Sequence, residues 1–207
     1  MGGGARKHVT CPVCNSGDRE RFVYYYLKHN TDLFKDSCSA VLHFAPEPHI
    51  EQEIRNNPSC KYITGDIVPG RADYVVDITN IQFSENMFDY VICNHVIEHI
   101  IDEEKAINEL KRVLKPDGTI ILSTPISISD EKTYENPNII SPEDRLKYFG
   151  QEDHVRLYGL DVKERWSKYG LIIDEYNSED ITDKNIVDKY GFIVGDRIFI
   201  CKKAESF

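Results

Sequence analysis

Two histidines with an acidic and an amide neighbour stand in the heptapeptide NHVIEHI, residues 94–100. His95 and His99 are four positions apart, so their imidazoles share one face if a helical turn begins here. Because histidine titrates near neutrality, either ring could accept a proton from a reacting group. The pair also resembles two metal ligands, but no third ligand is apparent in the sequence, so we expect no metal. The alternative is a helix start at which Glu98 and His99 only satisfy backbone groups.

A second polar stretch is FGQEDHVRLYG, residues 149–159, in which two glycines bracket a run of ionisable side chains. We predict that this stretch lines the substrate pocket. His154 is a general-base candidate, and Arg156 could clamp an anionic group with its planar fork of donors. The other residues predicted to contact the substrate are Tyr134, Gln151 and Tyr158. The alternative is a surface salt-bridge cluster of Asp153, His154 and Arg156 that only shapes the loop.

Two aspartates end successive strand-like runs, Asp66 after KYITG and Asp77 after YVV. A carboxylate at a strand end can accept hydrogen bonds from both hydroxyls of a ribose, as in dinucleotide-binding folds. We predict this role for Asp66. We predict that Asp77 accepts from the exocyclic amine of an adenine while Ile78 packs on the ring. Singly, each aspartate also fits a solvated turn or a helix cap, but two acids at successive strand ends favour a nucleoside-like ligand.

Alternating strand and helix patterns position these residues. We expect strands at 40–45, 60–67, 72–78, 88–95, 119–126, 171–176 and 196–203. We expect helices at 19–30, 48–56, 103–114 with Asp102 as N-cap, from Ser141 and Pro142 onward, and at 163–170. This alternation indicates a parallel α/β sheet, in which ligands bind beyond the carboxyl ends of the strands.

The first of these strand ends lacks the expected glycines. The stretch VLHFAPEPHI, residues 41–50, runs from a strand directly into a helix, and such a turn at a nucleotide site is usually glycine-rich. Here Ala45, Pro46 and Glu47 occupy the turn. A small Ala45 still lets the backbone approach a ligand closely.

Composition and net charge argue against some classes of binding partner and indicate the cellular compartment. The chain has 207 residues, a formal net charge of −10 and six cysteines. The negative charge argues against DNA or an anionic membrane as partner. No apolar run approaches a membrane span, and six cysteines are too few for a disulfide scaffold, so we expect a cytoplasmic protein. Residues 1–5, MGGGA, have the composition of an added leader.

The sequence blocks VLHFAPE, YITGDI, VVDITNIQFSENMFDYVICNHVIEHI and ELKRVLKPDGTIILSTPI together resemble the core of the class I S-adenosylmethionine-dependent methyltransferases. CPVCNSGDRERF, HFAPEP and FGQEDHVRLYG resemble a subgroup of small bacterial members. The resemblance implies an α/β fold with a Rossmann-like, seven-stranded, mostly parallel sheet in a single domain at 40–207. It also implies that the segment 6–39 caps the site, where Arg19 and Arg21 could pair with an anionic substrate. The alternative for residues 19–30 is a solvated, charged helix.

The same resemblance implies S-adenosylmethionine as the cofactor. The residues that would bind it are Phe44, Ala45, Pro46, Glu47, Asp66, Ile67, Asp77, Ile78, Asn94 and His95. In the wider family the first strand carries an acidic residue and runs into a G-x-G turn. Here His43 replaces the acid, and Glu47 could take over the cofactor's ammonium group.

Methyl transfer from a sulfonium is an in-line displacement in which the protein chiefly orients donor and acceptor. We expect a small acceptor, neutral or anionic, that is methylated on oxygen, such as a sugar, a sugar phosphate or a related surface-glycan precursor, and a monomer or homodimer. The alternatives are a protein or RNA methyltransferase and a non-catalytic cofactor-binding homologue. Cys11 and Cys14 could bind zinc with His8 and His29, or remain a free, reduced pair.

Overall fold

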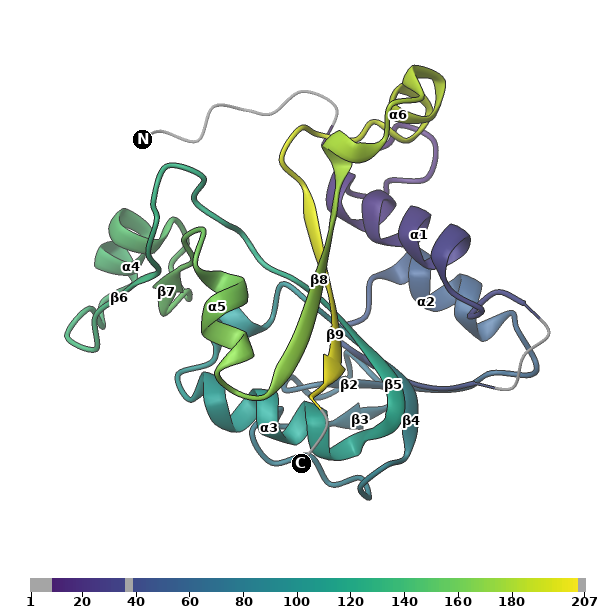
Figure 1. Ribbon diagram of the computed structural model, residues 1–207, viewed down its shortest axis with the longest axis horizontal. Helices are drawn as coiled ribbons and strands as arrows, with labels where there is room; N and C mark the ends of the chain where they lie inside the picture. Colours follow the sequence, from purple (N-terminus) through teal and green to yellow (C-terminus); the bar gives the residue numbers. More distant parts are fainter. Residues whose placement is uncertain (1–8, 36–38, 205–207) are drawn as a thin grey trace.

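A seven-stranded sheet forms the centre of the computed structural model, which describes residues 9–35 and 39–204 (Figure 1). The strand order is β3-β2-β1-β4-β5-β9-β8. The strands are β1 (Ala40–Phe44), β2 (Lys61–Asp66), β3 (Tyr74–Val75), β4 (Phe88–Asn94), β5 (Leu114–Ser123), β8 (Leu171–Asn177) and β9 (Arg197–Lys203). Neighbours from β3 to β5 pair in parallel, whereas β9 is antiparallel to both β5 and β8. The predicted mostly parallel α/β sheet is confirmed.

Helices cover both faces of this sheet (Figure 1). One face carries α3 (Glu103–Val113) and α5 (Val162–Ser167), and the other carries α1 (Asp18–Asn30), α2 (Pro48–Arg55) and α6 (Lys184–Tyr190). Because side chains alternate along a strand, neighbouring residues of β1 enter different cores: Leu42 packs toward α3 and Val41 toward α1 and α2. Within residues 9–35 and 39–204, no helix is long and apolar enough to cross a lipid bilayer.

Helix α1 lies in the predicted cap segment 6–39, yet it is a layer of the main core. Its apolar residues Phe22, Val23 and Leu27 are buried in the same cluster as residues of β1, α2 and β4. The Glu20 carboxylate accepts from the backbone N–H of Gly17 at the start of α1 (3.1 Å) and from that of His49 at the start of α2 (3.0 Å). This contact sets the position of α1 above the carboxyl edge of β1.

A small lobe projects from the sheet between β5 and α5 (Figure 1, left). It contains the antiparallel pair β6 (Tyr134–Glu135) and β7 (Arg156–Leu157), with α4 (Pro142–Phe149) between them. The Ser141 hydroxyl caps α4 by accepting from the N–H of Asp144 (3.1 Å), and Gly150 ends the helix in a left-handed conformation at φ 88°. The helix was predicted from Ser141 and Pro142; the strands β6 and β7 were not.

The predicted strand at 72–78 is shorter than expected. Only Tyr74 and Val75 are in a strand, and Asp73, just before it, forms a reciprocal pair with Thr64. The Asp73 N–H donates to Thr64 Oγ1 (2.9 Å), and the Thr64 N–H donates to Asp73 Oδ2 (3.0 Å). The last predicted helix is also shorter, since α5 ends at Ser167 and a turn leads to Gly170.

Candidate functional site

A cleft of about 560 Å³ opens at the carboxyl ends of β1, β2 and β4. We call it the donor cleft. Its lining residues include Phe44, Ala45, Asp66, Ile67, Asp77, Ile78, His95 and His99, all predicted as site residues, together with Val68, Arg71, Val96 and Asp153. Small-molecule sites typically occupy roughly 300–1,000 Å³, so the volume suits a nucleoside-sized ligand. Ile67 is 64% exposed and Val68 40% exposed, which leaves apolar surface for a ring to cover.

Each of the two aspartates in the donor cleft accepts hydrogen bonds from its own turn through one carboxylate oxygen. Asp66 Oδ1 accepts from the Val68 N–H (2.7 Å), and Asp77 Oδ1 accepts from the N–H and the hydroxyl of Thr79 (2.8 Å each). Within the described part of the chain, no hydrogen bond is assigned to the second oxygen of either carboxylate. The turn role and the ligand role are therefore compatible, because one oxygen orients the carboxylate and the other faces no competing donor.

The glycine-free turn after β1 is stabilised by a buried histidine. Ala45 takes a left-handed conformation (φ 46°), and its N–H donates to Gly65 O (2.8 Å). The His43 ring is fully buried, with Nδ1 2.7 Å from the Tyr62 hydroxyl and Nε2 2.7 Å from Glu47 Oε2. Glu47 therefore returns a carboxylate to the end of β1, where His43 stands in place of an acid.

Two further predicted residues continue this chain of contacts. Asn94 Nδ2 donates to Glu47 Oε1 (3.1 Å), and its own Oδ1 accepts from the Ser123 hydroxyl (3.0 Å). Neither Asn94 nor Glu47 lines the donor cleft itself, and the same holds for Pro46. The structure thus places these three behind the residues that form the wall.

His95 has a strained backbone at the end of β4. Its φ is 53°, a region that costs most residues energy and that recurs at functional sites. Its Nδ1 lies 3.4 Å from Arg19 Nη1 and 3.3 Å from Glu98 Oε1. His95 precedes the 3₁₀ turn η1 (Ile97–His99). The expected helical face shared by His95 and His99 is therefore not formed, although both rings line the donor cleft.

Glu98 is a buried carboxylate among three imidazoles. It is 1% exposed, and its Oε2 accepts from the Thr124 hydroxyl (3.1 Å). Burial raises the pKa of this carboxyl, but the hydrogen bond and charge of His95 outweigh that effect, so the pKa lies below its usual value. One ligand atom each from Glu98, His99 and His154 lies within 4.8 Å of the others. The sequence shows no third ligand because His154 is remote from this turn along the chain.

The stretch 149–159 contributes to the site through its first half. Asp153 lines the donor cleft, its Oδ2 is 3.2 Å from His99 Nδ1, and its Oδ1 accepts from Gln151 Nε2 (2.9 Å). Gln151 itself is exposed. His154 is buried, and this burial lowers the pKa of its imidazole, which stays neutral at pH 7. Its ring packs edge-on against that of His99.

The second half of the stretch differs from the prediction. Arg156 is 3% exposed and donates to the carbonyls of Ile97, Ile100 and Ile101 and to Glu135. Tyr158 is fully buried, and its hydroxyl donates to Glu103. Neither side chain lines the donor cleft, because both are used to fix the η1 turn and the start of α3. The substrate contacts of Arg156 and Tyr158 stay predictions, and in this structure both side chains hold the protein's own backbone and carboxylates.

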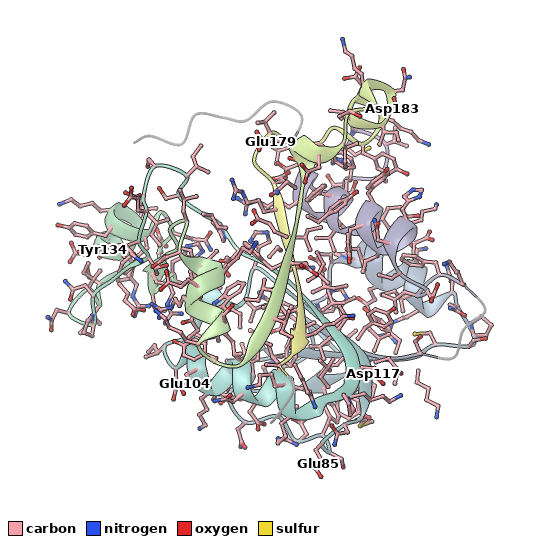
Figure 2. The ribbon with its side chains drawn as sticks, viewed as in Figure 1. Glu85, Glu104, Asp117, Tyr134, Glu179 and Asp183 are labelled. Carbon is pink, nitrogen blue, oxygen red and sulfur yellow. The ribbon has the colours of Figure 1, made fainter. Side chains whose placement is uncertain are left out.

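Tyr134 also lies away from the cleft. It is 43% exposed in β6, at the outer side of the projecting lobe (Figure 2). Its ring packs near those of Tyr148 and Phe149, with centroid distances of 6.4 and 5.9 Å. The structure does not bring this predicted substrate residue to the donor cleft.

A second cleft of about 300 Å³ meets the first at His95. We call it the acceptor cleft. It lies between α1, the end of β5 and the start of β9, and its walls include Arg19, Ser123, Thr124, Ile126, Val194 and Arg197. Arg197 was not predicted. Its Nη1 donates to Glu175 (2.8 Å), whereas its buried Nε has no hydrogen-bond partner among the described residues.

Among the described residues, no metal-ligand group of three or more includes Cys11 or Cys14. Cys11 and Cys14 are free thiols, and the His29 ring packs on Tyr25 at the end of α1, with a centroid distance of 4.4 Å. His8 and the leader at 1–5 lie outside the described residues.

Comparison with known proteins connects this geometry to a family. Residues 51–122, less than half of the chain, match the family described as "Methyltransferase domain". Among curated proteins, Phosphoethanolamine N-methyltransferase 2 of Caenorhabditis elegans is 37% identical over 49 residues, which are 24% of this chain and 11% of that protein. The chain thus spans a small part of the length of that relative.

Solved structures extend the likeness to nearly the whole chain. The YcgJ protein of Bacillus subtilis is 15% identical with a TM-score of 0.58, over 88% of this chain and 100% of that one. Phosphoethanolamine N-methyltransferase 2 of Haemonchus contortus, in complex with phosphomonomethylethanolamine and S-adenosylhomocysteine, is 16% identical with a TM-score of 0.58, over 91% of this chain and 53% of that one. At such identity the likeness shows the fold. Residues 51–122 thus resemble a methyltransferase domain, and the chain has the fold of the methyltransferase structures that it resembles.

Proposed function

We propose that this protein transfers a methyl group from S-adenosylmethionine to a hydroxyl of a small anionic acceptor, such as a sugar or sugar phosphate. The observation that carries the proposal is the position of His95, which lines both the donor cleft and the acceptor cleft. An in-line displacement requires donor and acceptor to meet at one point. Among the described residues, His95 is the one that lines both clefts.

The donor cleft fits an adenosyl group with an aminoacyl tail. Asp66 and Asp77 each offer a carboxylate oxygen at the carboxyl edge of the sheet, matching ribose hydroxyls and an adenine amine. The exposed apolar side chains of Ile67 and Val68 offer a surface for the adenine ring. Glu47, outside the cleft lining, supplies negative charge at the end of β1 and so favours a positively charged tail electrostatically.

The acceptor cleft favours an anion. Two arginines, Arg19 and Arg197, line it with one carboxylate, that of Asp196, and the buried Nε of Arg197 is a donor without a partner in the described part of the chain. A phosphate or carboxylate would supply the missing acceptor, and arginine suits this role because its fork of N–H groups matches the oxygens. The volume of about 300 Å³ limits the ligand to a small molecule.

The reaction requires one proton transfer and one methyl transfer. When bound, S-adenosylmethionine supplies a methyl group on a positively charged sulfur. The acceptor hydroxyl loses its proton to a base, for which His95 is in the right place. The oxygen–carbon bond forms as the carbon–sulfur bond breaks, and the electron pair of that bond stays on sulfur. The products are the methyl ether and S-adenosylhomocysteine.

A second candidate is methylation of an amine. Two proteins similar to this chain are phosphoethanolamine N-methyltransferases, whose acceptors combine a phosphate with an amine. The arginine-lined cleft would suit such a phosphate equally well. Amine and hydroxyl acceptors should therefore be compared in one activity assay.

The test has two stages. Calorimetry should show that S-adenosylhomocysteine binds, and no binding at millimolar concentration would remove the proposal. A panel of sugar phosphates, hydroxy acids and phosphorylated amines is then assayed for S-adenosylhomocysteine formation. Arg19→Gln should raise the acceptor KM roughly 10-fold, the loss of about one charge-assisted hydrogen bond. The matched control is Lys28→Gln, which removes a positive charge from the same helix outside the cleft.

A further inference from the structure

Three side chains with metal-binding atoms converge where the donor cleft meets the buried core. Glu98 and His154 are 1% and 6% exposed, and His99, which lines the cleft, completes the group. One ligand atom from each lies within 4.8 Å of the others. We propose that Glu98, His99 and His154 bind a divalent transition-metal ion such as Zn²⁺ beside the donor cleft.

The donor set suits such an ion chemically. Two imidazoles and one carboxylate form the protein ligands of catalytic zinc sites and of other sites that keep coordination positions open. Magnesium and calcium prefer sets made of oxygen, so the two imidazoles favour a transition metal.

Each imidazole has one nitrogen occupied by an outer partner. His99 Nδ1 is 3.2 Å from Asp153 Oδ2, and His154 Nδ1 is 3.3 Å from Phe149 O. A proton on each Nδ1 donates to these oxygens and leaves the lone pair of Nε2 for a metal. Metal-bound histidines are commonly oriented by a carboxylate or a backbone carbonyl in this manner.

The third ligand and the local backbone are also held in place. Glu98 Oε2 accepts from the Thr124 hydroxyl (3.1 Å), and Glu98 O accepts from the Val155 N–H (2.9 Å), which joins the η1 turn to the segment that carries His154. Arg156 holds the same turn by donating to the carbonyls of Ile97 and Ile100. Arg156 and the Val155 N–H thus hold two segments that are distant in the sequence next to each other around the ligand atoms.

The spacing requires only a small closure. Ligands at about 2.1 Å from a tetrahedral metal lie roughly 3.4 Å from each other. The distances of up to 4.8 Å in the cluster would shorten by rotation of side chains. His99 is half-buried and lines the donor cleft, so an open coordination position would face that cleft.

This geometry also specifies the acceptor more closely. A divalent ion polarises a bound oxygen and lowers the pKa of a hydroxyl, so the site favours an acceptor hydroxyl over an amine. That second step depends on the proposed function, whereas metal binding does not.

The experiment uses the full-length protein without a histidine tag, with Cys11→Ser and Cys14→Ser so that the thiols cannot bind the ion. After treatment with a chelator, the protein is titrated with Zn²⁺ by calorimetry and with Co²⁺ by visible absorption. We expect one Zn²⁺ per chain. His99→Ala and His154→Ala should each lower the affinity by more than about 100-fold, and Asp153→Asn by about 10-fold, since outer partners typically contribute 10–100-fold. His49→Ala, a histidine on α2 outside the cluster, should leave the affinity unchanged.

The outcomes separate the metal site from the methyltransferase activity. Absence of Zn²⁺ binding at micromolar concentration, or equal affinity in the wild type, His99→Ala and His154→Ala, would overturn the site. The melting temperature and circular dichroism of each variant verify that it is folded; Glu98→Gln provides an isosteric variant if a histidine variant is not. Undiminished methyl transfer in the presence of a chelator would overturn the role of the metal in the reaction while leaving the proposed function intact.

Discussion

His43 Nε2 lies 2.7 Å from Glu47 Oε2, and this contact holds the Glu47 carboxylate at the end of β1. The His43 ring is fully buried, so the carboxylate of Glu47 is drawn toward β1 from the following turn. The second oxygen of Glu47 accepts from Asn94 at the end of β4. In the wider family that the sequence resembles, the first strand carries an acidic residue. In this chain the carboxylate comes from Glu47, in the turn four residues after His43.

Replacing Glu47 with Gln should weaken binding of S-adenosylhomocysteine. The substitution keeps the shape of the side chain but removes the negative charge beside the expected position of the aminoacyl ammonium. Because Glu47 does not line the cleft, we expect an electrostatic loss of about 0.5–1 kcal/mol, which corresponds to a rise in Kd of roughly 2- to 5-fold. Calorimetry measures the change, with Glu53→Gln, an exposed position on the same helix α2, as control. Equal Kd values for the two variants would remove Glu47 from the cofactor site.

Asp66→Asn should weaken binding of the same ligand by about 1–3 kcal/mol. The amide keeps an oxygen for the Val68 N–H, so the turn remains intact while the charged acceptor for the ribose hydroxyls is lost. Asp77→Asn should give a smaller loss, because one amine contact replaces two hydroxyl contacts. Asp117→Asn, in an exposed part of β5, is the control. A larger loss for Asp77 than for Asp66 would reverse the assigned roles.

Ala45→Gly should raise the free energy of unfolding by about 0.5–1 kcal/mol. Ala45 has φ 46°, and a left-handed conformation costs non-glycine residues roughly 1–2 kcal/mol, only part of which is offset by the greater entropy of an unfolded glycine. Urea denaturation measures the change. Ala106→Gly, inside α3, should have the opposite sign and lose at least about 1 kcal/mol. If Ala45→Gly also lowered the free energy of unfolding, the left-handed conformation of Ala45 would not be a source of strain.

The ion pair between Asp73 and Arg55 should make stability depend on pH. Arg55 Nη2 donates to both oxygens of Asp73, at 2.8 and 2.9 Å. Burial raises the pKa of Asp73, but the hydrogen bonds from Arg55 and Thr64 outweigh it and leave the pKa below its usual value. The folded protein therefore binds this proton less readily than the unfolded chain.

The resulting stabilisation is present above the unfolded pKa of about 3.9 and is lost as the pH falls through the lower folded value. Asp73→Asn should be less stable than the wild type at pH 7, by up to about 1 kcal/mol for a pair this exposed. The difference should shrink below about pH 4. Urea titrations at pH 7 and pH 3 compare the two proteins, and a difference that stays constant would assign the effect to packing instead of charge.

Much of the fold follows from local patterns. The apolar runs of β4 and β5 mark strands buried on both faces, and Asp102 caps α3 as expected, accepting from the Lys105 N–H (3.0 Å). The short pair β6 and β7 has no such pattern. It depends on contacts between segments separated by α4, which no window of sequence contains.

The donor cleft was predictable for a related reason. The carboxyl ends of parallel strands meet at one edge, so Asp66 and Asp77 could be assigned before the structure. The contacts of Arg156 could not be predicted, because its partners are backbone carbonyls of a 3₁₀ turn and the sequence does not show where unpaired carbonyls lie. The meeting of Glu98 with His154 depends on the same long-range packing.

His95 allows the most direct test of how the two clefts cooperate. His95→Asn should lower kcat by roughly 10²–10⁴-fold if the imidazole is the base that accepts the hydroxyl proton. Asparagine tolerates the left-handed φ of 53° better than most residues, so the backbone of the turn should be preserved. S-adenosylhomocysteine binding should stay within a few-fold of the wild type, because Asp66 and Asp77 are unchanged. His49→Asn, outside both clefts, is the matched control. A variant with normal kcat but a raised acceptor KM would show that His95 only shapes the junction, and the proton would then have to leave through solvent or another group of the site.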